Sequence, residues 1–600
     1  MNSIDFVATT PPALAVNSSV SYETHAPDAL LAELCQSRLA PDQAILQAKA
    51  NREQDGNPHW QLPVGMAHYI DKRYSEALAS LREVEAAGRA NCNWLVLAGM
   101  CARQIPGLES DACDYYRQAL LLDPSRADCY YNLGNLLKDE DPVEAELLYR
   151  SSLRLDSSSA TVWHNFGISL NNQNRHAEAL APLRISLLLD PLVADVWCNL
   201  GLAYYGSDLF DQAERCFRFT IALDKNHAPS HLNLGNALMR SLRAEDAISF
   251  LERGVELDQS STDSLFNLAL ANLLLGRYSP GWEYYEARFR AKDFNARQIP
   301  TSGPQIRRLE DCPGPGDPPL VVWSEQGMGD SIQFCRYLAL LDSANVPFVF
   351  LTHPCLLNLQ RGWTGLGERV QCLGSTDPAS DHRPHVALMS LPLLFRTELQ
   401  TVPAPVPYLS TTESVPASLR LPPPPGGLSI GFVWASNPDN KAMYRNKSMP
   451  AHLLIPRLVQ LADLDLITLH TLQFGPDSEQ LAPWRGHARI TEWQRIVGDY
   501  SDTAHIVSQL DLVITVDTAV AHLAGALNRP TWLLLPQNAD FRWLRGRSDS
   551  PWYPSMRLFR QSSHGDWHSV VQQVFQALDV MFLLDLDSLV SNQSQNVHHG

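Results

Sequence analysis

Two predicted strand-to-helix turns carry side chains suited to acid–base chemistry and to phosphate binding. In the first, SEQGMGDSIQFCRYL (324–338), Gly327 and Gly329 form a tight loop after a strand, and Asp330 opens a helix. A carboxylate in this position could accept the proton of a hydroxyl group as a general base. Alternatively, Asp330 only caps its helix, a role worth about 1 kcal/mol. The Gly-x-Gly-Asp pattern is weak alone, and a second turn strengthens it.

The second turn, VDTAVAHLAGAL (516–527), places a hydroxyl group at a predicted helix start. Asp517 ends a strand, Thr518 begins the helix, and His522 follows one helical turn later on the same face. The unpaired N–H groups at such a helix start attract the oxygens of a pyrophosphate. Alternatively, Thr518 is a simple cap and His522 is a hydrogen-bonded interface histidine. We favour the phosphate-binding interpretation.

Both turns belong to a region, from about residue 318, in which buried-strand patterns alternate with helical ones. This alternation is typical of parallel α/β sheets, whose ligands bind at the carboxyl ends of the strands. We expect two Rossmann-like halves around a cleft, 300–401 and 428–580, joined by a proline-rich connector, 402–427. The predicted strands are 320–324, 346–351 and 386–390 in the first half, and 428–434, 463–471, 510–517 and 530–536 in the second.

A departing diphosphate must have its negative charge stabilised, either by a metal ion or by protein groups. Sugar-transferring enzymes that use a divalent cation hold it with an Asp-x-Asp pair. Here the pair Asp463/Asp465 lies before a strand, and the pair Asp585/Asp587 lies in the tail. The sequence also has no Cys-x-x-Cys pair and no His/Cys cluster at zinc spacing. We therefore predict a phosphate-binding site without a metal and without a cofactor.

Small residues recur at a fixed period in the amino-terminal half. Steps of 33 to 35 residues separate Gly65, Gly99, Gly134, Gly167, Gly201, Gly235 and Ala269. A bulky residue follows in each repeat: Leu81, Tyr116, Tyr149, Leu183, Phe217, Leu251 and Tyr285. The small positions would let two helices approach closely, and the bulky one would fill the gap against the next repeat. The pattern resembles the tetratricopeptide repeat, a helix–turn–helix unit, in about seven copies over 57–290.

An asparagine lies two residues before five successive small positions: Asn132, Asn165, Asn199, Asn233 and Asn267. An amide side chain both donates and accepts hydrogen bonds, so one per repeat could bind an extended polypeptide whatever its side chains. This spacing resembles the asparagine ladder of the O-GlcNAc transferase solenoid, which binds acceptor polypeptide. Alternatively, each asparagine only satisfies the neighbouring helix backbone. We favour a ladder that lines an acceptor groove.

Several carboxyl-terminal segments resemble bacterial tetratricopeptide proteins with a glycosyltransferase family 9 domain and, more distantly, the heptosyltransferases of lipopolysaccharide assembly. They are SEQGMGDSIQFCRYL, GFVWASNPDNKAMYRNKSMP, DTAHIVSQLDLVITVDTAVAHLAGALNRPTWLLLP and FRWLRGRSDSPWYPSMRLFRQ. The resemblance covers about residues 300–575 and implies a GT-B-like fold. It also implies that Asp330 is the general base, within an acceptor-side loop that includes Gln326, Gly327, Gly329 and Gln333.

The same resemblance implies a donor site in the second half. Asp517, Thr518, Ala519 and His522 would contact the phosphates or the sugar of the donor. A lysine neutralises the diphosphate in the heptosyltransferases, and the corresponding loop here begins near Asn437 and offers Lys441, Arg445 and Lys447. We favour Lys447, then Arg445, with Asn437 also on the donor side. Trp543 or Arg542 could stack on a base or a sugar, although ordinary packing explains them equally well.

Composition argues against several other partners. The net charge is −18 and no long basic stripe is present, so nucleic acid is not expected. The 11 scattered cysteines indicate a reducing compartment. The amino terminus carries Asp5 and no basic region, unlike a signal peptide, and no apolar run reaches the roughly 18 residues of a membrane span. We expect a cytoplasmic protein, with a helical or flexible segment at 1–56 and a flexible tail at 581–600.

Together these patterns predict an α-solenoid followed by a GT-B-like α/β domain. The predicted activity is metal-independent, inverting transfer of a sugar from a nucleotide sugar to a protein or glycan acceptor that the solenoid presents. The alternative is a repeat-based interaction scaffold whose nucleotide-binding domain is catalytically degenerate. A third possibility is a structural assembly protein with no ligand in the cleft.

Overall fold

The computed structural model describes residues 26–291, 299–362, 366–375, 378, 380–411, 414–422, 427–439 and 441–596. Its contacts divide the chain into two compact units, Met1–Ala237 and Leu238–Gly600. The expectations for the first 25 residues, for parts of the proline-rich connector and for the last four residues lie outside the described residues.

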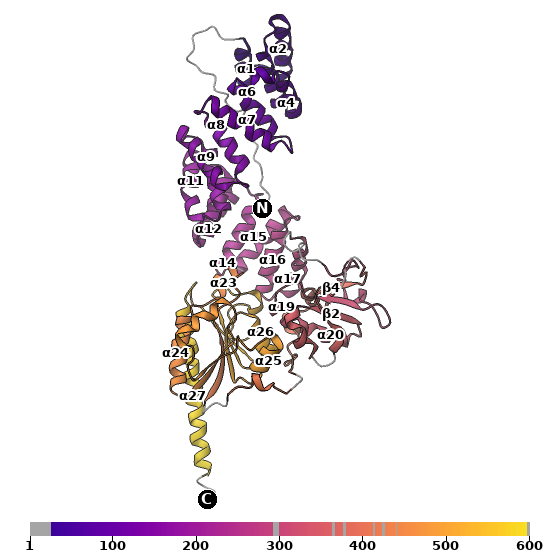
Figure 1. Cartoon of the computed structure of the whole chain (residues 1–600), viewed down its shortest axis with the longest axis vertical. Helices are drawn as coiled ribbons and strands as arrows, with labels where there is room; N and C mark the ends of the chain where they lie inside the picture. Colours follow the sequence, from indigo (N-terminus) through magenta and orange to yellow (C-terminus); the bar gives the residue numbers. More distant parts are fainter. Residues whose placement is uncertain are drawn as a thin grey trace. The chain divides into compact units, whose positions relative to one another are not determined.

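The amino-terminal part consists of consecutive helix pairs, as the repeat period predicts. Two helices, α1 (Ala26–Cys35) and α2 (Pro41–Asp55), come first, and the paired helices of the first unit follow them along the chain (Figure 1). Within the described residues, seven pairs are present: α3 (Gln61–Ile70) and α4 (Tyr74–Arg82), α6 (Cys92–Arg103) and α7 (Glu109–Leu122), α8 (Ala127–Leu137) and α9 (Pro142–Leu155), α10 (Ala160–Asn172) and α11 (His176–Leu189), α12 (Ala194–Gly206) and α13 (Phe210–Leu223), α14 (Ala228–Arg240) and α15 (Ala244–Leu257), and α16 (Thr262–Leu274) and α17 (Tyr278–Tyr285). The first unit ends within α14, so the last helices of the repeat region belong to the same unit as the sheets.

The repeat glycines lie where the two helices of one pair approach closely. A Cβ atom added at Gly201 would lie 2.5 Å from the ring of Phe217, and one at Gly167 would lie 2.5 Å from Leu183. Gly65, Gly99 and Gly134 face Leu81, Tyr116 and Tyr149 in the same way. The bulky residue therefore packs on the glycine of its own repeat. This corrects the expectation that it fills the gap against the next repeat.

The second unit contains two parallel sheets, which confirms the predicted α/β architecture. The four-stranded sheet has the order β3-β2-β1-β4, and the six-stranded sheet has the order β10-β9-β8-β5-β6-β7. Every pair of neighbouring strands is parallel. The strands are β1 (Leu320–Trp323), β2 (Phe348–Thr352), β3 (Val370–Cys372), β4 (His385–Ala387), β5 (Leu428–Val433), β6 (Ile467–Thr471), β7 (Ile490–Glu492), β8 (Leu512–Val516), β9 (Thr531–Leu535) and β10 (Met556–Arg560).

Helices cover both faces of the six-stranded sheet (Figure 1). On one face, Ile430 and Phe432 of β5 pack in one core with α24 (Ala451–Asp463) and α27 (Trp567–Asn596). On the other face, Val513 of β8 packs with α25 (Tyr500–Val507) and α26 (Ala519–Ala526). The remaining helices of at least four residues in the α/β region are α19 (Met328–Phe334), α20 (Leu338–Ser343), α21 (Leu357–Arg361), α22 (Leu391–Leu394) and α23 (Lys441–Lys447).

Two strand predictions need correction, and three further strands were not predicted. The segment 386–390 is a strand only to Ala387, because Leu388–Ser390 turns into a 3-10 helix. The segment 463–471 becomes a strand only at Ile467, because α24 continues to Asp463. The short strands β3 and β7 and the arginine-containing strand β10 are additional, since none of them forms a long apolar run.

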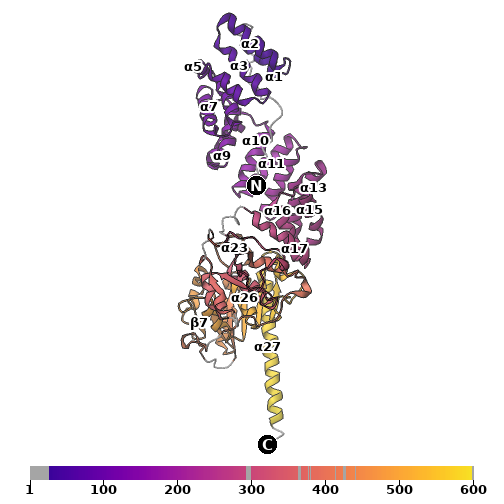
Figure 2. The same cartoon turned by 90° about the vertical axis from the view of Figure 1, so that its right-hand side faces the viewer.

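The segment 581–600, expected as a flexible tail, continues α27 as a helix to Asn596, beyond the sheet (Figure 2).

Candidate functional site

The carboxyl ends of the strands locate a candidate site in each sheet. In the six-stranded sheet the chain runs from β5 to β6 and β7 on one side, and from β8 to β9 and β10 on the other. The switch in direction lies between β5 and β8, the position where open parallel sheets bind ligands. Thr518 follows β8, and the loop that leads to Lys447 follows β5. In the smaller sheet the corresponding switch lies between β1 and β4, and the loop with Asp330 follows β1.

The structure brings the two predicted turns together. Helices α19 and α26, which begin at these turns, pack against each other. A Cβ atom added at Gly329 would lie 3.0 Å from Cδ2 of His522 and 3.5 Å from the Cα atom of Ala519. A larger residue at position 329 would therefore separate the two helix starts. The glycine is explained by this close approach between the halves.

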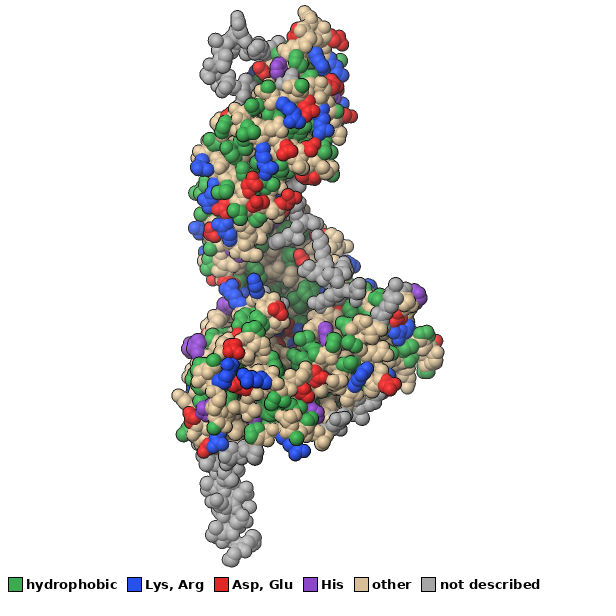
Figure 3. Space-filling model, in the orientation of Figure 1, with side chains coloured by type: hydrophobic (Ala, Val, Ile, Leu, Met, Phe, Trp, Pro, Cys, Tyr) green, Lys and Arg blue, Asp and Glu red, His purple; other side chains and the backbone are tan. Residues whose placement is uncertain are grey.

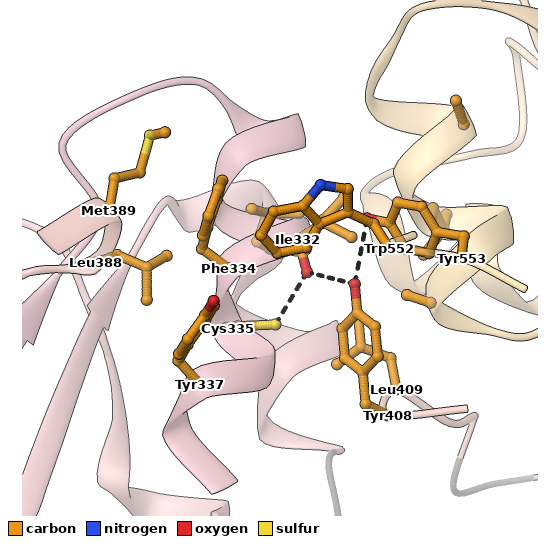
Figure 4. Packing of buried hydrophobic residues seen from close by; sticks show 14 of the residues in the cluster. Ile332, Phe334, Cys335, Tyr337, Leu388, Met389, Tyr408, Leu409, Trp552 and Tyr553 are labelled. Carbon is orange, nitrogen blue, oxygen red and sulfur yellow. Dashed lines mark hydrogen bonds between the residues drawn. The ribbon is translucent and has the colours of Figure 1, made fainter. Parts of the chain in front are cut away.

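Aromatic residues hold the two α/β halves together beside these helices. The Tyr408 hydroxyl donates to the carbonyl oxygen of Ile332 at 3.0 Å and lies 3.4 Å from the Tyr553 hydroxyl (Figure 4). The buried Arg336 guanidinium donates to the carbonyl oxygens of Trp552 and Pro403 at 2.7 and 2.9 Å. It also lies over the rings of Tyr408 and Tyr553. This packing fixes α19 against the second half.

Lys447 forms an ion pair at the switch point of the larger sheet. Its Nζ atom lies 2.7 Å from Oδ2 of Asp517, and the two side chains are 15% and 6% exposed. Burial lowers the pKa of Lys447, but the carboxylates of Asp517 and Asp540 raise it by more than burial lowers it. The net shift of the Lys447 pKa is therefore upward. Lys447 is therefore a charged ammonium group beside the start of α26. Lys441, Arg445 and Asn437 are exposed on the same segment.

Arg542 connects the two halves through charged side chains. Its Nη2 atom donates to Oδ1 of Asp330, and its Nη1 atom donates to Oδ1 of Asp540 at 2.7 Å. Its Nε atom donates to Oε1 of Gln333 at 2.8 Å. Burial lowers the pKa of Arg542, whereas Asp540 and Asp330 raise it, so the guanidinium stays charged. These contacts match the ordinary-packing explanation of Arg542, and stacking on a ligand stays a prediction.

Asp330 caps its helix, as one of the two interpretations expects, and it also contacts Arg542, while its role as a general base stays a prediction. Its Oδ2 atom accepts the backbone N–H of Gly327 at 3.1 Å, which caps α19. Its Oδ1 atom accepts from Arg542. The side chain remains 23% exposed. Two other residues near this loop are also held by hydrogen bonds. Gln326 donates to the Tyr285 hydroxyl at 2.9 Å, and the side-chain oxygen of Gln333 accepts from Arg542. The buried amide nitrogen of Gln333 has no partner among the described residues.

His522 is an interface residue in this structure. Its Nδ1 atom lies 2.9 Å from the Tyr553 hydroxyl, and its ring stacks on Trp543 at a centroid distance of 5.3 Å. Burial lowers the pKa of His522 to about 3, so the imidazole is neutral. This geometry matches the interface alternative, and Trp543 is fully buried by the same packing. Thr518, in contrast, is half-buried at the start of α26, and its side chain makes no capping hydrogen bond.

The neutral His522 predicts a loss of stability in acid. Its pKa is about 3 in the fold but about 6.5 in an unfolded chain, so only the unfolded state gains a proton as the pH falls below 6.5. At a pH of about 4.5 the free energy of unfolding should be about 2–3 kcal/mol lower than at pH 7 from this group alone. Urea unfolding at both pH values measures the loss. His522→Gln should shrink it, and an unchanged pH dependence in that variant would refute the assignment.

Two elements of the site have little sequence signal. Asp540 belongs to the polar run after β9. Burial raises the pKa of Asp540, but the charges of Arg542 and Lys447 lower it by more, so the net shift is downward. Arg288, just after the last repeat helix, donates to Oε1 of Glu325 at 3.0 Å. Glu325 also accepts the backbone N–H of Met389 at 3.1 Å, so it ties β1 to the end of β4. Only the position of Asp540 after a strand end could have suggested it.

The predicted asparagine ladder is partly exposed in every repeat that carries it. Within the first unit these asparagines bond to side chains of the preceding repeat. Asn132 accepts from Arg103 at 3.1 Å, Asn165 donates to the Tyr131 hydroxyl at 2.8 Å, Asn199 lies 3.0 Å from Nε2 of His164, and Asn233 donates to Sγ of Cys198 at 3.7 Å. Asn199 also donates to the carbonyl oxygen of Asp195. The partners are mostly side chains, unlike the backbone alternative, and polypeptide binding stays a prediction.

The described residues contain neither a cluster of metal ligands nor a membrane-spanning helix. In this part of the chain, no group of three or more His, Cys, Asp or Glu side chains could hold a metal ion. The described helices include none that is long and apolar enough to cross a bilayer. On the face shown in Figure 3, basic and acidic side chains lie among one another.

Comparison with known proteins identifies the repeats. The tetratricopeptide repeat family model matches residues 198–263. Protein FlbA of Caulobacter vibrioides (strain ATCC 19089 / CIP 103742 / CB 15) is 26% identical over 382 residues, which are 56% of this chain and 58% of FlbA. The chain thus spans somewhat more than half of that relative.

Solved structures similar to this chain include other repeat proteins. The structure of pilF from Pseudomonas aeruginosa is 24% identical, with a TM-score of 0.31, over 35% of this chain and 100% of that one. YrrB, a TPR protein with an unusual peptide-binding site, is 19% identical, with a TM-score of 0.28, over 31% of this chain and 95% of that one. This chain carries tetratricopeptide repeats, a scaffold that supports protein interaction, followed by an α/β region with two parallel sheets.

Proposed function

We propose that the α/β region is a GT-B-like glycosyltransferase domain that moves a sugar from a nucleotide-sugar donor to an acceptor, with inversion and without a metal ion. The observation that carries this proposal is the charged network at the facing helix starts. Asp330 from one half contacts Arg542 and, through it, Asp540, while Lys447 and Asp517 pair in the other half. A carboxylate and fixed cations from opposite halves are what acid–base chemistry next to a departing diphosphate requires.

The donor diphosphate would lie at the start of α26. The first turn of α26 begins where β8 ends, at the carboxyl edge of the sheet, so its N–H groups and Thr518 would be available to a ligand there. Ala519 is half-buried and small, so a ligand can approach the backbone. The Lys447 ammonium would neutralise the phosphates, in competition with Asp517. His522, which contacts Tyr553 and Trp543, would hold α26 in position rather than touch the donor.

The acceptor hydroxyl would lose its proton to Asp330. Arg542 occupies Oδ1 of Asp330, so the contact between the two side chains would have to lengthen during transfer. An arriving diphosphate supplies the charge that competes for Arg542, because both carboxylate and phosphate accept a guanidinium well. The general base would then become effective when the donor is bound.

The repeats would hold a polypeptide acceptor along their asparagines. Asn165→Ala, Asn199→Ala or Asn233→Ala should each weaken acceptor binding by about 0.5–1.5 kcal/mol, since each removes one amide hydrogen bond. Fluorescence anisotropy with a labelled acceptor peptide measures the affinity, and circular dichroism monitors the helices. Asn171→Ala is a matched control, because this amide donates to the carbonyl oxygen of Asn199 within the repeats. Loss of helicity without a change in peptide affinity would show that the ladder is structural.

A scaffold with an inactive α/β region is the second candidate. The match to the tetratricopeptide model favours an interaction role, and both oxygens of Asp330 have partners within the fold. This candidate predicts a folded protein that binds a peptide partner but neither hydrolyses nor transfers a donor sugar.

A donor panel separates the two candidates. Nucleotide sugars of different bases and sugars are first screened by thermal shift, in which a ligand at 100 times its Kd stabilises by about 2.7 kcal/mol. Release of nucleoside diphosphate is then followed with and without an excess of EDTA. We expect turnover that survives chelation. Turnover that EDTA abolishes and Mg²⁺ or Mn²⁺ restores would contradict the metal-independent mechanism, and no donor turnover at all would favour the scaffold.

A further inference from the structure

A separate cavity lies at the carboxyl ends of β9 and β10, on the side of the sheet away from β5. Its volume is about 180 Å³. Residues from the loops after both strands line it together with two leucines of the repeat region. The lining includes Arg545, Arg560, Gln537, Asn538, Leu242 and Leu274. Liquid water occupies about 30 Å³ per molecule, so the cavity has room for a small polar group and a short organic substituent.

Positive charge is concentrated beside this cavity. Arg545 and Arg547 lie near Arg560. Burial, together with the positive charges of Arg545 and Arg547, lowers the pKa of Arg560 to about 10. Arg560 donates to the carbonyl oxygens of Arg547 and Trp543, and among the described residues no carboxylate lies within 4.0 Å of it. Arg547 pairs with Asp549, which is 68% exposed.

The positive charge of Arg545 is also only weakly compensated by a nearby carboxylate. Its nearest carboxylate is Oε2 of Glu245 at 3.9 Å, and that side chain is 70% exposed. Burial lowers the pKa of Arg545, and Glu245 raises it less. Holding like charges together with little compensation is unfavourable unless an anion joins them. Two guanidiniums that need about two negative charges fit a dianion better than a single carboxylate.

The backbone of the cavity wall is strained at two leucines. Leu544 has a φ of 50° and a ψ of −164°, a conformation that is nearly restricted to glycine. Leu242 has a φ of 60°. The equivalent turn position of other repeats also has a positive φ and carries Lys72, Gly107, Asn174, Asp208 or Gly276. The conformation therefore belongs to the repeat turn, although leucine tolerates it less well than glycine, asparagine or aspartate does. Both leucines line the cavity, and the carbonyl oxygen of Leu242 accepts a hydrogen bond from Arg545.

Charge and strain at one place indicate a built ligand site, because unfavourable conformations persist where function requires them. We propose that this cavity binds a phosphate group, either inorganic phosphate or the phosphate of a small phosphomonoester, between Arg545 and Arg560. The guanidiniums would bind the phosphate oxygens in the bidentate manner that arginine favours. Leu242, Leu274 and Leu544 would form the apolar wall for an organic substituent. This site is separate from the donor site proposed above and does not depend on that proposal.

Isothermal titration of the full chain with inorganic phosphate, at constant ionic strength, tests the site. We use the Thr518→Leu background so that the start of α26 cannot contribute. One phosphate should bind saturably per chain, and Arg560→Gln or Arg545→Gln should weaken binding at least about tenfold, because charged hydrogen bonds are lost. Arg557→Gln is the matched control: it removes the same charge from an exposed position on the same strand, and affinity should stay within about twofold.

The outcomes are distinct. Absence of saturable phosphate binding would overturn the proposal, as would equal affinity in Arg545→Gln or an equal loss in Arg557→Gln. If Arg560→Gln does not fold, Arg545→Gln decides alone. Titration with glycerol phosphate distinguishes the sources: tighter binding than inorganic phosphate supports a phosphomonoester that uses the leucine wall, and weaker binding supports free phosphate.

Discussion

Asp330→Asn is expected to lower the rate of sugar transfer by about 10²–10⁴-fold without weakening donor binding, because the variant loses the general base and also the carboxylate that competes with the diphosphate for Arg542. Asparagine can still accept the Gly327 N–H that caps α19, so the turn should keep its shape. Turnover and Kd for the donor are measured on the same preparation. Asp342→Asn, an exposed carboxylate paired with Arg369 in the same half, is the matched control. Turnover near the wild-type rate in Asp330→Asn would refute the assignment.

Arg542→Met should lower the free energy of unfolding of the second unit by about 3–5 kcal/mol. Arg542 is 9% exposed, and its removal leaves Asp540 and Asp330 without their cation, the costly way to break a buried ion pair. Urea unfolding followed by tryptophan fluorescence measures the change. Arg308→Met removes an exposed arginine paired with Asp311 and should cost less than about 1 kcal/mol. Similar costs for the two variants would show that the network does not hold the halves together.

The sequence predicts the elements whose pattern is local. The repeats follow from one glycine and one bulky residue per period, and the glycine contacts with Phe217 and Leu183 explain why these positions are restricted. Strands β1, β5, β8 and β9 are central strands, buried on both faces, so they form continuous apolar runs. The strand β10 escapes detection because its arginines interrupt the run, and β7 because it is only three residues long and half-buried.

The candidate site is predictable in its location and not in its contacts. Asp330 and Thr518 were identifiable because each follows a strand end, whereas Lys447 was expected only from the family resemblance. The partnership of Asp330 with Arg542 joins residues 212 positions apart, and no local pattern encodes it. His522 shows the same limit: its helical spacing from Thr518 suggests a shared ligand, but the Tyr553 hydroxyl and the Trp543 ring lie on that side. The tertiary packing of the two halves decides which polar groups remain accessible.

Calorimetric titration of a nucleoside diphosphate tests the central claim most directly, that the donor diphosphate binds at the start of α26. Thr518→Leu should weaken binding at least about tenfold, because the leucine removes the hydroxyl and blocks access to the N–H groups of the first turn. Thr161→Leu, an exposed position in the first unit, should bind like the wild type. Saturable binding by the wild type with the predicted loss in Thr518→Leu supports the claim. Equal affinity in the wild type and Thr518→Leu would contradict it.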